Sequence, residues 1–140
     1  MAMLDDLDGL LAQNNVVVFT TFRRDGMPQQ SLVTVGKMDG GLAFTTRSRN
    51  AKAYNLARDP RCAIMLVKPD NRGFAVLDGR AEVLGRDNSD ADGLRLRLRE
   101  VYRVAAGKEH PDWDEYDRVM LEEGRVAVLL KPDRIFARNA

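Results

Sequence analysis

Alternating hydrophobic and polar positions fill the first third of the chain. Val16 to Phe22 is rich in β-branched and aromatic residues, and the turn-forming Arg24-Asp25-Gly26 separates it from a second β-prone run, Gln29 to Met38. The turn Asp39-Gly40-Gly41 leads into a third run, Leu42 to Thr46. Because such short turns join neighbouring antiparallel strands, the pattern predicts a three-stranded meander.

Helical spacing flanks this meander. One amphipathic helix is predicted over the first dozen residues from the apolar positions Leu4, Leu7, Leu10 and Leu11. A short helix is predicted from Ala51 to Ala57, and Asp59-Pro60 ends it because the residue before a proline avoids helical geometry. Two strands follow, Arg61 to Lys68 and Phe74 to Leu84, and Gly79 is a natural position for a bulge or bend.

The last third combines two helices with a final β-segment. One helical face carries the apolar residues Leu94, Leu98, Val101, Tyr102 and Ala105, whereas a solvated face is predicted for Arg95, Arg97, Arg99 and Arg103. Asp112 and Glu115 resemble an N-cap with a reciprocal carboxylate, and the helix that follows has a core face of Trp113, Tyr116 and Met120. A strand from Val126 to Leu130 is separated by Pro132-Asp133 from an edge strand or turn at Arg134 to Ala137.

These elements predict an α+β fold that is mainly β. Six to seven short antiparallel strands with helices clustered late favour a barrel, since closure removes exposed sheet edges. Residues 1–140 fit a single domain of this kind.

Composition narrows the possible functions. The 22 basic residues nearly cancel the 21 acidic ones, so no nucleic-acid-sized basic field is present. With one histidine and one cysteine, the chain lacks the clustered ligands of a zinc, copper or iron–sulfur site. Cys62 lies in an apolar strand and His110 in a loop, so we expect a buried structural thiol and a surface histidine. No apolar run approaches the length of a membrane span, and we expect a cytoplasmic protein without a membrane partner.

The most informative stretch runs off the third strand into the helix that begins near Ala51. Arg47, Arg49 and Lys52 crowd the N-terminus of that helix, where each cation is unfavourable by about 0.3–1 kcal/mol. A phosphate would relieve this repulsion, because the hydroxyls of Thr46 and Ser48 and free N–H groups can donate to its oxygens. Three independent surface charges are the alternative explanation.

The second strand offers a polar border for such a site. Gln29, Ser31 and Val33 share one face and Gln30, Leu32 and Thr34 the other, as strand alternation dictates. The first face fits a cofactor-lining surface, and a solvated strand face has nearly the same pattern. No nucleophile motif, P-loop or Gly-x-Gly-x-x-Gly occurs, so no catalytic side chain is predicted and a bound cofactor must supply any reactive atom.

Several motifs together resemble the pyridoxamine-phosphate-oxidase-like split β-barrel superfamily, in particular its small deazaflavin-dependent oxidoreductases. The likeness covers almost the whole chain. It is carried by Asp25-Gly26-Met27-Pro28-Gln29, by Thr45-Thr46 with Ser48-Arg49 and Lys52, by Asn55-Leu56-Ala57-Arg58-Asp59-Pro60-Arg61, and by His110-Pro111-Asp112-Trp113-Asp114-Glu115-Tyr116.

The resemblance implies a flavin-binding split barrel and a homodimer whose cofactor lies at the subunit interface. The implied cofactor-binding residues are Gln29, Ser31, Val33, Thr45, Thr46, Arg47, Ser48, Arg49, Asn50, Lys52 and Asn55. Either Arg49 or Lys52 is the main phosphate ligand. Additional charge for the acidic tail of a deazaflavin is implied for Lys37, Arg47, Arg58 or Arg61.

The function that follows is hydride transfer from coenzyme F420 to a small conjugated organic acceptor. One alternative is an FMN-binding oxidoreductase of the same superfamily. The other is a cofactor-binding protein without enzymatic activity, and a heme-handling relative is least favoured because only one histidine is present.

Overall fold

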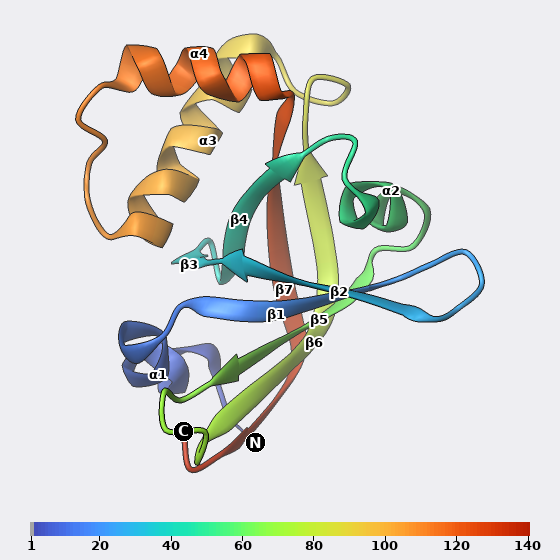
Figure 1. Cartoon of the computed structure of the whole chain (residues 1–140), viewed down its shortest axis with the longest axis vertical. Helices are drawn as coiled ribbons and strands as arrows, with labels where there is room; N and C mark the ends of the chain where they lie inside the picture. The colour runs from blue at the N-terminus through green and yellow to red at the C-terminus, as the bar shows by residue number, and fades with distance from the viewer. Residues whose placement is uncertain (1) are drawn as a thin grey trace.

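Antiparallel strands form one curled sheet in the order β2-β1-β5-β6-β7-β4-β3 (Figure 1). The computed structural model describes residues 2–140. Over these residues the seven strands are β1 (Val16–Phe22), β2 (Pro28–Thr34), β3 (Gly36–Met38), β4 (Gly41–Arg47), β5 (Arg61–Val67), β6 (Phe74–Leu84) and β7 (Arg125–Arg138). The predicted α+β fold, mainly β, is confirmed.

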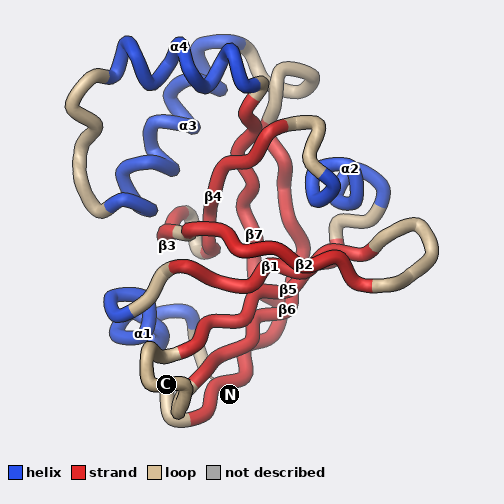
Figure 2. Tube along the Cα trace, in the orientation of Figure 1, coloured by secondary structure: helices blue, strands red, loops and turns tan. Residues whose placement is uncertain are grey.

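Helices flank the sheet in three places (Figure 2). They are the 3₁₀ helix η1 (Leu4–Leu7), α1 (Asp8–Gln13), α2 (Ala51–Arg58), α3 (Ala91–Ala106) and α4 (Trp113–Glu123). α3 and α4 lie together at one end, and the C-terminus lies near α1 at the other (Figure 1). The single helix predicted for the first dozen residues divides into η1 and α1, and its Met1 lies outside the described residues. No helix of residues 2–140 has both the length and the apolar character to cross a membrane.

The predicted strand from Gln29 to Met38 is wrong in its continuity. It divides at Val35 into β2, which pairs with β1, and β3, which pairs with β4 at the opposite edge of the sheet. Asn15 holds this crossing: its carbonyl accepts from the Val35 N–H at 2.9 Å, and its amide donates to the Val35 and Ala105 carbonyls. The local pattern could not reveal this change of partner, because both halves have the same strand periodicity.

The predicted break at Pro132-Asp133 is also wrong, because β7 is continuous. The pairing register with β6 shifts between Asp78 and Gly79, and Pro132 lies opposite Gly79. A bulge leaves a position without a ladder hydrogen bond, so a proline that lacks the N–H is tolerated there. The irregularity predicted at Gly79 is confirmed.

Two apolar clusters stabilise the fold. Inside the curled sheet Phe19 and Phe44 meet edge to face with ring centroids 4.8 Å apart. The second cluster lies on the other face of β4 and β7, where α3 and α4 pack against residues such as Ala43 and Leu129. β4 and β7 are therefore buried on both faces. This packing fixes the two helices beside the end of β4, where the basic stretch begins.

Candidate functional site

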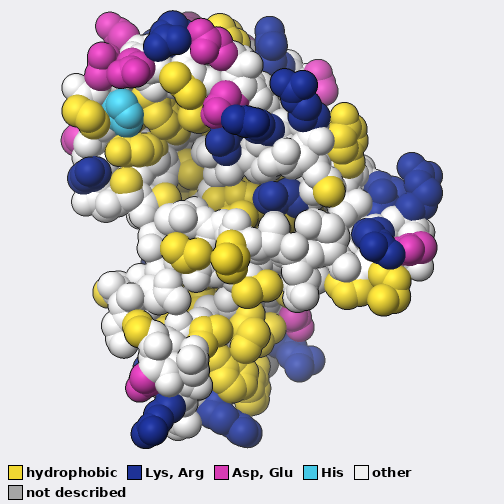
Figure 3. Space-filling model, in the orientation of Figure 1, with side chains coloured by type: hydrophobic (Ala, Val, Ile, Leu, Met, Phe, Trp, Pro, Cys, Tyr) yellow, Lys and Arg dark blue, Asp and Glu magenta, His cyan; other side chains and the backbone are white. Residues whose placement is uncertain are grey.

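A cavity of about 610 Å³ separates strand β2 and the start of α2 from helices α3 and α4. Figure 3 shows the molecule hollowed on this face, between the helices and β2. The lining residues come from β2, β4, the start of α2, α3, α4 and the start of β7: Leu32, Val33, Thr34, Thr45, Thr46, Asn50, Lys52, Val101, Tyr102, Ala105, Ala106, Tyr116, Met120 and Arg125. Its volume lies within the range of about 300–1,000 Å³ that is typical of small-molecule sites.

One end of the cavity is polar and basic. Thr45 and Thr46 end β4, Lys52 lies in the first turn of α2, and Arg125 opens β7. Asn50, which precedes α2, donates its side-chain amide to the Thr46 hydroxyl at 2.9 Å. The Asn50 side chain therefore does not cap the helix, and α2 has no acidic residue in its first turn.

Lys52 is a half-buried cation without a counter-ion. No carboxylate of residues 2–140 lies within 4.0 Å of its ammonium group, and no hydrogen bond holds that group. Burial and, secondarily, the positive charge of Arg125 lower the pKa of Lys52 from its usual 10.5. The partial positive charge of the helix N-terminus acts in the same direction. The local field therefore favours a bound anion.

Glu123 is the carboxylate that pairs with basic residues at this end of the cavity, and two arginines share it. Arg47 Nη2 lies 2.8 Å and Arg125 Nε 3.1 Å from its oxygens. The hydrogen bond from Arg47, followed by that from Arg125, lowers the pKa of Glu123 below its usual 4.5. Glu123 pairs with Arg47 and Arg125, and Lys52 has no carboxylate partner within residues 2–140, so the three cations outnumber the one carboxylate at the basic end of the cavity.

The other end of the cavity is apolar and aromatic. Tyr102 and Tyr116 lie on α3 and α4 with ring centroids 5.3 Å apart. The Tyr116 hydroxyl donates to the Leu98 carbonyl at 2.7 Å, and burial raises the pKa of Tyr116 to about 12. Tyr116 is therefore a protonated structural side chain at neutral pH. A molecule with an anionic group at one end and a ring system at the other matches this division of the cavity.

His110 belongs to the aromatic cluster behind Tyr102, and part of its side chain stays at the surface, as predicted (Figure 3). Its ring centroid lies 5.0 Å from that of Tyr102 and 5.7 Å from that of Trp113, and the side chain is half-buried. The Asp112 N–H donates to His110 Nδ1 at 2.9 Å. Asp112 caps α4 as predicted, accepting from the Glu115 N–H, but His110 takes the place that the Glu115 carboxylate was expected to fill.

The cavity brings together part of the predicted site. Five of the eleven predicted residues line it: Val33, Thr45, Thr46, Asn50 and Lys52. Arg47 lies just outside, paired with Glu123. Arg49 and Ser48 are exposed on the loop before α2, and neither side chain has a hydrogen-bond partner among residues 2–140.

Three further predicted residues, Asn55 on α2 and Gln29 and Ser31 on β2, are not among the residues that line the cavity. Asn55 is buried, donates to the Thr21 hydroxyl at 3.1 Å and accepts from Arg58. Gln29 accepts from the Thr21 hydroxyl. Ser31 Oγ is buried without a hydrogen-bond partner in the described residues.

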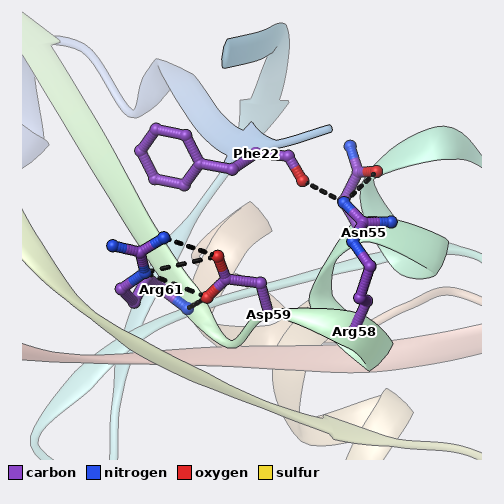
Figure 4. Close-up of polar contacts among 5 residues, drawn as sticks. All are labelled: Phe22, Asn55, Arg58, Asp59 and Arg61. Atoms are coloured by element: carbon purple, nitrogen blue, oxygen red, sulfur yellow. Dashed lines mark hydrogen bonds and ion pairs between the residues drawn. The ribbon is translucent and has the colours of Figure 1, made fainter. Parts of the chain in front are cut away.

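The four basic residues named for an acidic tail all have partners within the chain. Lys37 pairs with Asp5 and Asp8, and Arg47 with Glu123. Figure 4 shows Arg58 donating to the Phe22 carbonyl and to Asn55, and Arg61 held by the Asp59 carboxylate at 2.8 Å. The hydrogen bond from Arg61 lowers the pKa of Asp59 to about 2. Among the basic residues near the cavity, Arg49 and Lys52 have no ion-pair partner in the described chain.

The sequence did not reveal the cavity wall that α3, α4 and β7 contribute. Arg125 stands opposite Arg47 in the β4–β7 ladder, a pairing that no local motif indicates. Tyr102, Tyr116 and Met120 were interpreted as core residues, and they are both core and cavity wall. The one local sign of this wall was Arg125, a single cation at the start of the otherwise apolar strand from Val126 to Leu130.

Comparison with known proteins identifies the architecture. The family model for pyridoxamine 5′-phosphate oxidase matches residues 3–138. The chain belongs to the pyridoxamine 5′-phosphate oxidase family.

Several solved structures share the fold at low sequence identity. A conserved hypothetical protein of Mycobacterium tuberculosis is 20% identical, with a TM-score of 0.77 over 98% of this chain and 84% of that one. An FMN binding protein related to pyridoxamine 5′-phosphate oxidase, from Nostoc punctiforme, is 19% identical, with a TM-score of 0.67 over 98% and 86%. A structure named F420 reductase is 21% identical, with a TM-score of 0.61 over 92% and 94%. Proteins named for each of the two cofactors therefore share this split-barrel fold.

Proposed function

We propose that this protein is an oxidoreductase that binds coenzyme F420 in the 610 Å³ cavity and transfers a hydride to a small conjugated organic acceptor. The observation that carries the proposal is the unpaired Lys52 at the basic end of a cavity whose other end is aromatic. A ligand with a phosphate and a flavin-type ring meets both requirements at once.

The side chains at the basic end fit a phosphate. Lys52 and Arg125 supply charge, the hydroxyls of Thr45 and Thr46 can donate hydrogen bonds, and the N–H groups of Ala51 and Lys52 in the first turn of α2 have no acceptor in the described chain. Val33, Tyr102 and Met120 supply apolar area for a ring. When bound, a deazaflavin supplies a hydride at its ring, and the residues of the cavity bind it, orient it and exclude water.

FMN is the second candidate, and one observation favours it. The four basic residues that the family resemblance offered for an acidic glutamyl tail already have partners within the chain, and FMN has no such tail. Arg49 is an exposed cation near the cavity that remains available for a tail. Lys52→Met should weaken both cofactors, whereas Arg49→Met should weaken coenzyme F420 alone.

The experiment is a parallel fluorescence titration of the purified protein with coenzyme F420, FMN and riboflavin, followed by an assay of F420H₂ oxidation with unsaturated acceptors. Tight F420 binding and acceptor-dependent oxidation support the proposal. Selective binding of FMN with reoxidation by air would establish the second candidate. Binding without turnover across the acceptors would leave a cofactor-binding protein, and binding of none would refute the function.

An apolar stripe across the outer face of the sheet supports the homodimer as part of this proposal. The pairing registers place Leu32, Val18, Met65, Val76 and Phe136 in one row that crosses β2, β1, β5, β6 and β7. Leu32 is 70% exposed and Phe136 46%. Hydrophobic side chains gather over these strands in Figure 3. Exposed apolar surface of this extent is typical of a protein interface.

The stripe and the cavity meet at Leu32, which belongs to both. A partner that covers the stripe would therefore stand beside the cavity mouth. Met65 lies in the stripe but outside the cavity, so Met65→Arg should yield a monomer by light scattering and also weaken cofactor binding. Leu96→Arg, on the exposed side of α3, is the matched control. A dimer that survives Met65→Arg would refute this interface.

A further inference from the structure

A second cavity of about 420 Å³ lies between the first half of α3 and the second half of α4. Leu94 and Leu98 form one wall, and Met120 and Leu121 form the other. The aromatic cluster of Tyr102, His110, Trp113 and Tyr116 joins the same two helices farther along, so it does not fill this space. Leu121 is 64% exposed although it faces the cavity.

More basic than acidic residues line this cavity. Four arginines line it, Arg86, Arg95, Arg118 and Arg125, against two aspartates, Asp92 and Asp117. No serine, threonine, asparagine or lysine is among the lining residues, in contrast to the first cavity. The polar groups are therefore charged side chains around an apolar wall, with more arginines than aspartates, rather than a set of hydroxyl and amide donors.

Carboxylates already pair with three of these arginines within residues 2–140: Asp92 with Arg95, Glu122 with Arg118 and Glu123 with Arg125. Asp117 is held from outside the cavity by two hydrogen bonds from Arg99, a residue that does not line it. Asp92 makes one 3.4 Å ion pair with Arg95, and both side chains are largely exposed. Exposed pairs of this kind contribute only about 0–1 kcal/mol, so a ligand carboxylate can exchange with them. Arg86 forms no ion pair within residues 2–140.

We propose that this second cavity binds a small amphipathic anion, an apolar chain that ends in a single carboxylate. The chain lies between Leu98 and Leu121, and the carboxylate meets Arg86, the lining arginine without an ion pair, and exchanges with the exposed pairs of Arg95 and Arg118. Burial of the chain supplies affinity and the arginines select the sign of the head group. This site is distinct from the cofactor cavity, and Met120 and Arg125 contribute to the walls of both.

The test is isothermal titration calorimetry of the full chain with dodecanoate below its micelle-forming concentration. Dodecyltrimethylammonium, which has the same chain and the opposite charge, is the control ligand. We expect saturable one-to-one binding of dodecanoate, and affinity for the cationic control that is lower by at least about tenfold because the rim is basic. Equal binding of the two ligands would overturn the role of the arginines.

Two leucines give a matched pair of variants. Leu121 and Leu96 are both exposed on the helices, but only Leu121 lines the cavity. Leu121→Asp should weaken dodecanoate by about tenfold or more, since it places a carboxylate against the apolar chain, and Leu96→Asp should have no effect. Equal effects of the two variants would contradict the site.

Lys52→Ala separates the two cavities. Dodecanoate affinity that is unchanged in this variant supports binding in the second cavity, whereas loss of affinity would assign the ligand to the cofactor cavity and overturn the proposal. Light scattering of Leu121→Asp provides the last check: a change of oligomeric state would show that a second copy of the chain, and not a small anion, covers this cavity.

Discussion

We expect Lys52 to lower the stability of the ligand-free protein and to raise its affinity for a bound anion. The side chain stands in the first turn of α2 without a counter-ion, and burial together with Arg125 lowers its pKa. A cation at a helix N-terminus is unfavourable by about 0.3–1 kcal/mol. Lys52→Met removes that charge and keeps an apolar stem of similar helix propensity. The ligand-free variant should therefore be more stable by roughly this amount at neutral pH.

The pH dependence of this gain follows from the direction of the shift. Because the folded state lowers the pKa of Lys52 below 10.5, folding is penalised wherever the ammonium is charged in both states. The advantage of Lys52→Met is complete below the folded pKa. It disappears as pH rises from that value through the ordinary pKa of lysine.

Affinity should change in the opposite direction. A hydrogen bond to a charged group contributes about 1.5–3 kcal/mol, which corresponds to about 10- to 150-fold in the dissociation constant. We expect Lys52→Met to weaken FMN or coenzyme F420 by this factor in a fluorescence titration. Arg49→Met makes the same charge change outside the cavity and should leave FMN affinity nearly unchanged.

The assay pair is urea denaturation of the ligand-free variants and cofactor titration of the same preparations. A Lys52→Met protein that is less stable than the parent would contradict the claim that the charge of Lys52 destabilises the ligand-free protein. Unchanged affinity in Lys52→Met would remove Lys52 from the site, and an equal loss of FMN affinity in Arg49→Met would show that the effect of Lys52→Met is not specific to the cavity.

Three further variants test the surroundings of the cavity. Glu123→Gln removes the carboxylate that pairs with Arg47, and it should raise FMN affinity by about two- to fivefold. The variant should also be less stable than the parent above the ordinary pKa of glutamate. This loss of stability should vanish as pH falls through the lowered pKa of Glu123, which pH-dependent denaturation would measure. Asn55→Ala should lower the free energy of unfolding by about 1–3 kcal/mol because it leaves the buried Thr21 hydroxyl without its amide donor, whereas intact stability with lost cofactor binding would place Asn55 in the site. Gly36→Ala should destabilise the protein by about 1–3 kcal/mol in urea titrations, because the added Cβ would lie 2.3 Å from the Val104 carbonyl carbon of α3, and a neutral result would refute that packing.

Much of the fold could be predicted because its determinants are local. The strand Phe74–Leu84 and its irregularity at Gly79, and the capping of α4 by Asp112, follow from periodicity and turn chemistry that act within a few residues. The division at Val35 could not be predicted, because Asn15 and the opposite sheet edge decide it from a distance in sequence.

The same distinction applies to the site. The basic stretch around Lys52 was visible because cations at a helix start are locally unfavourable. Arg125 and Tyr102 were not, since they reach the cavity only through the β4–β7 ladder and the packing of α3. Asn55 illustrates the converse: a motif position that resembles a ligand-binding residue is engaged by Thr21 and Arg58 inside the protein.

The measurement that tests the central claim most directly is the paired titration of FMN and riboflavin, which differ only in the phosphate. If the basic end of the cavity holds a phosphate through Lys52, FMN should bind with one site per chain and riboflavin at least about tenfold more weakly. Equal affinity for the two, or no binding of FMN and coenzyme F420, would contradict the account.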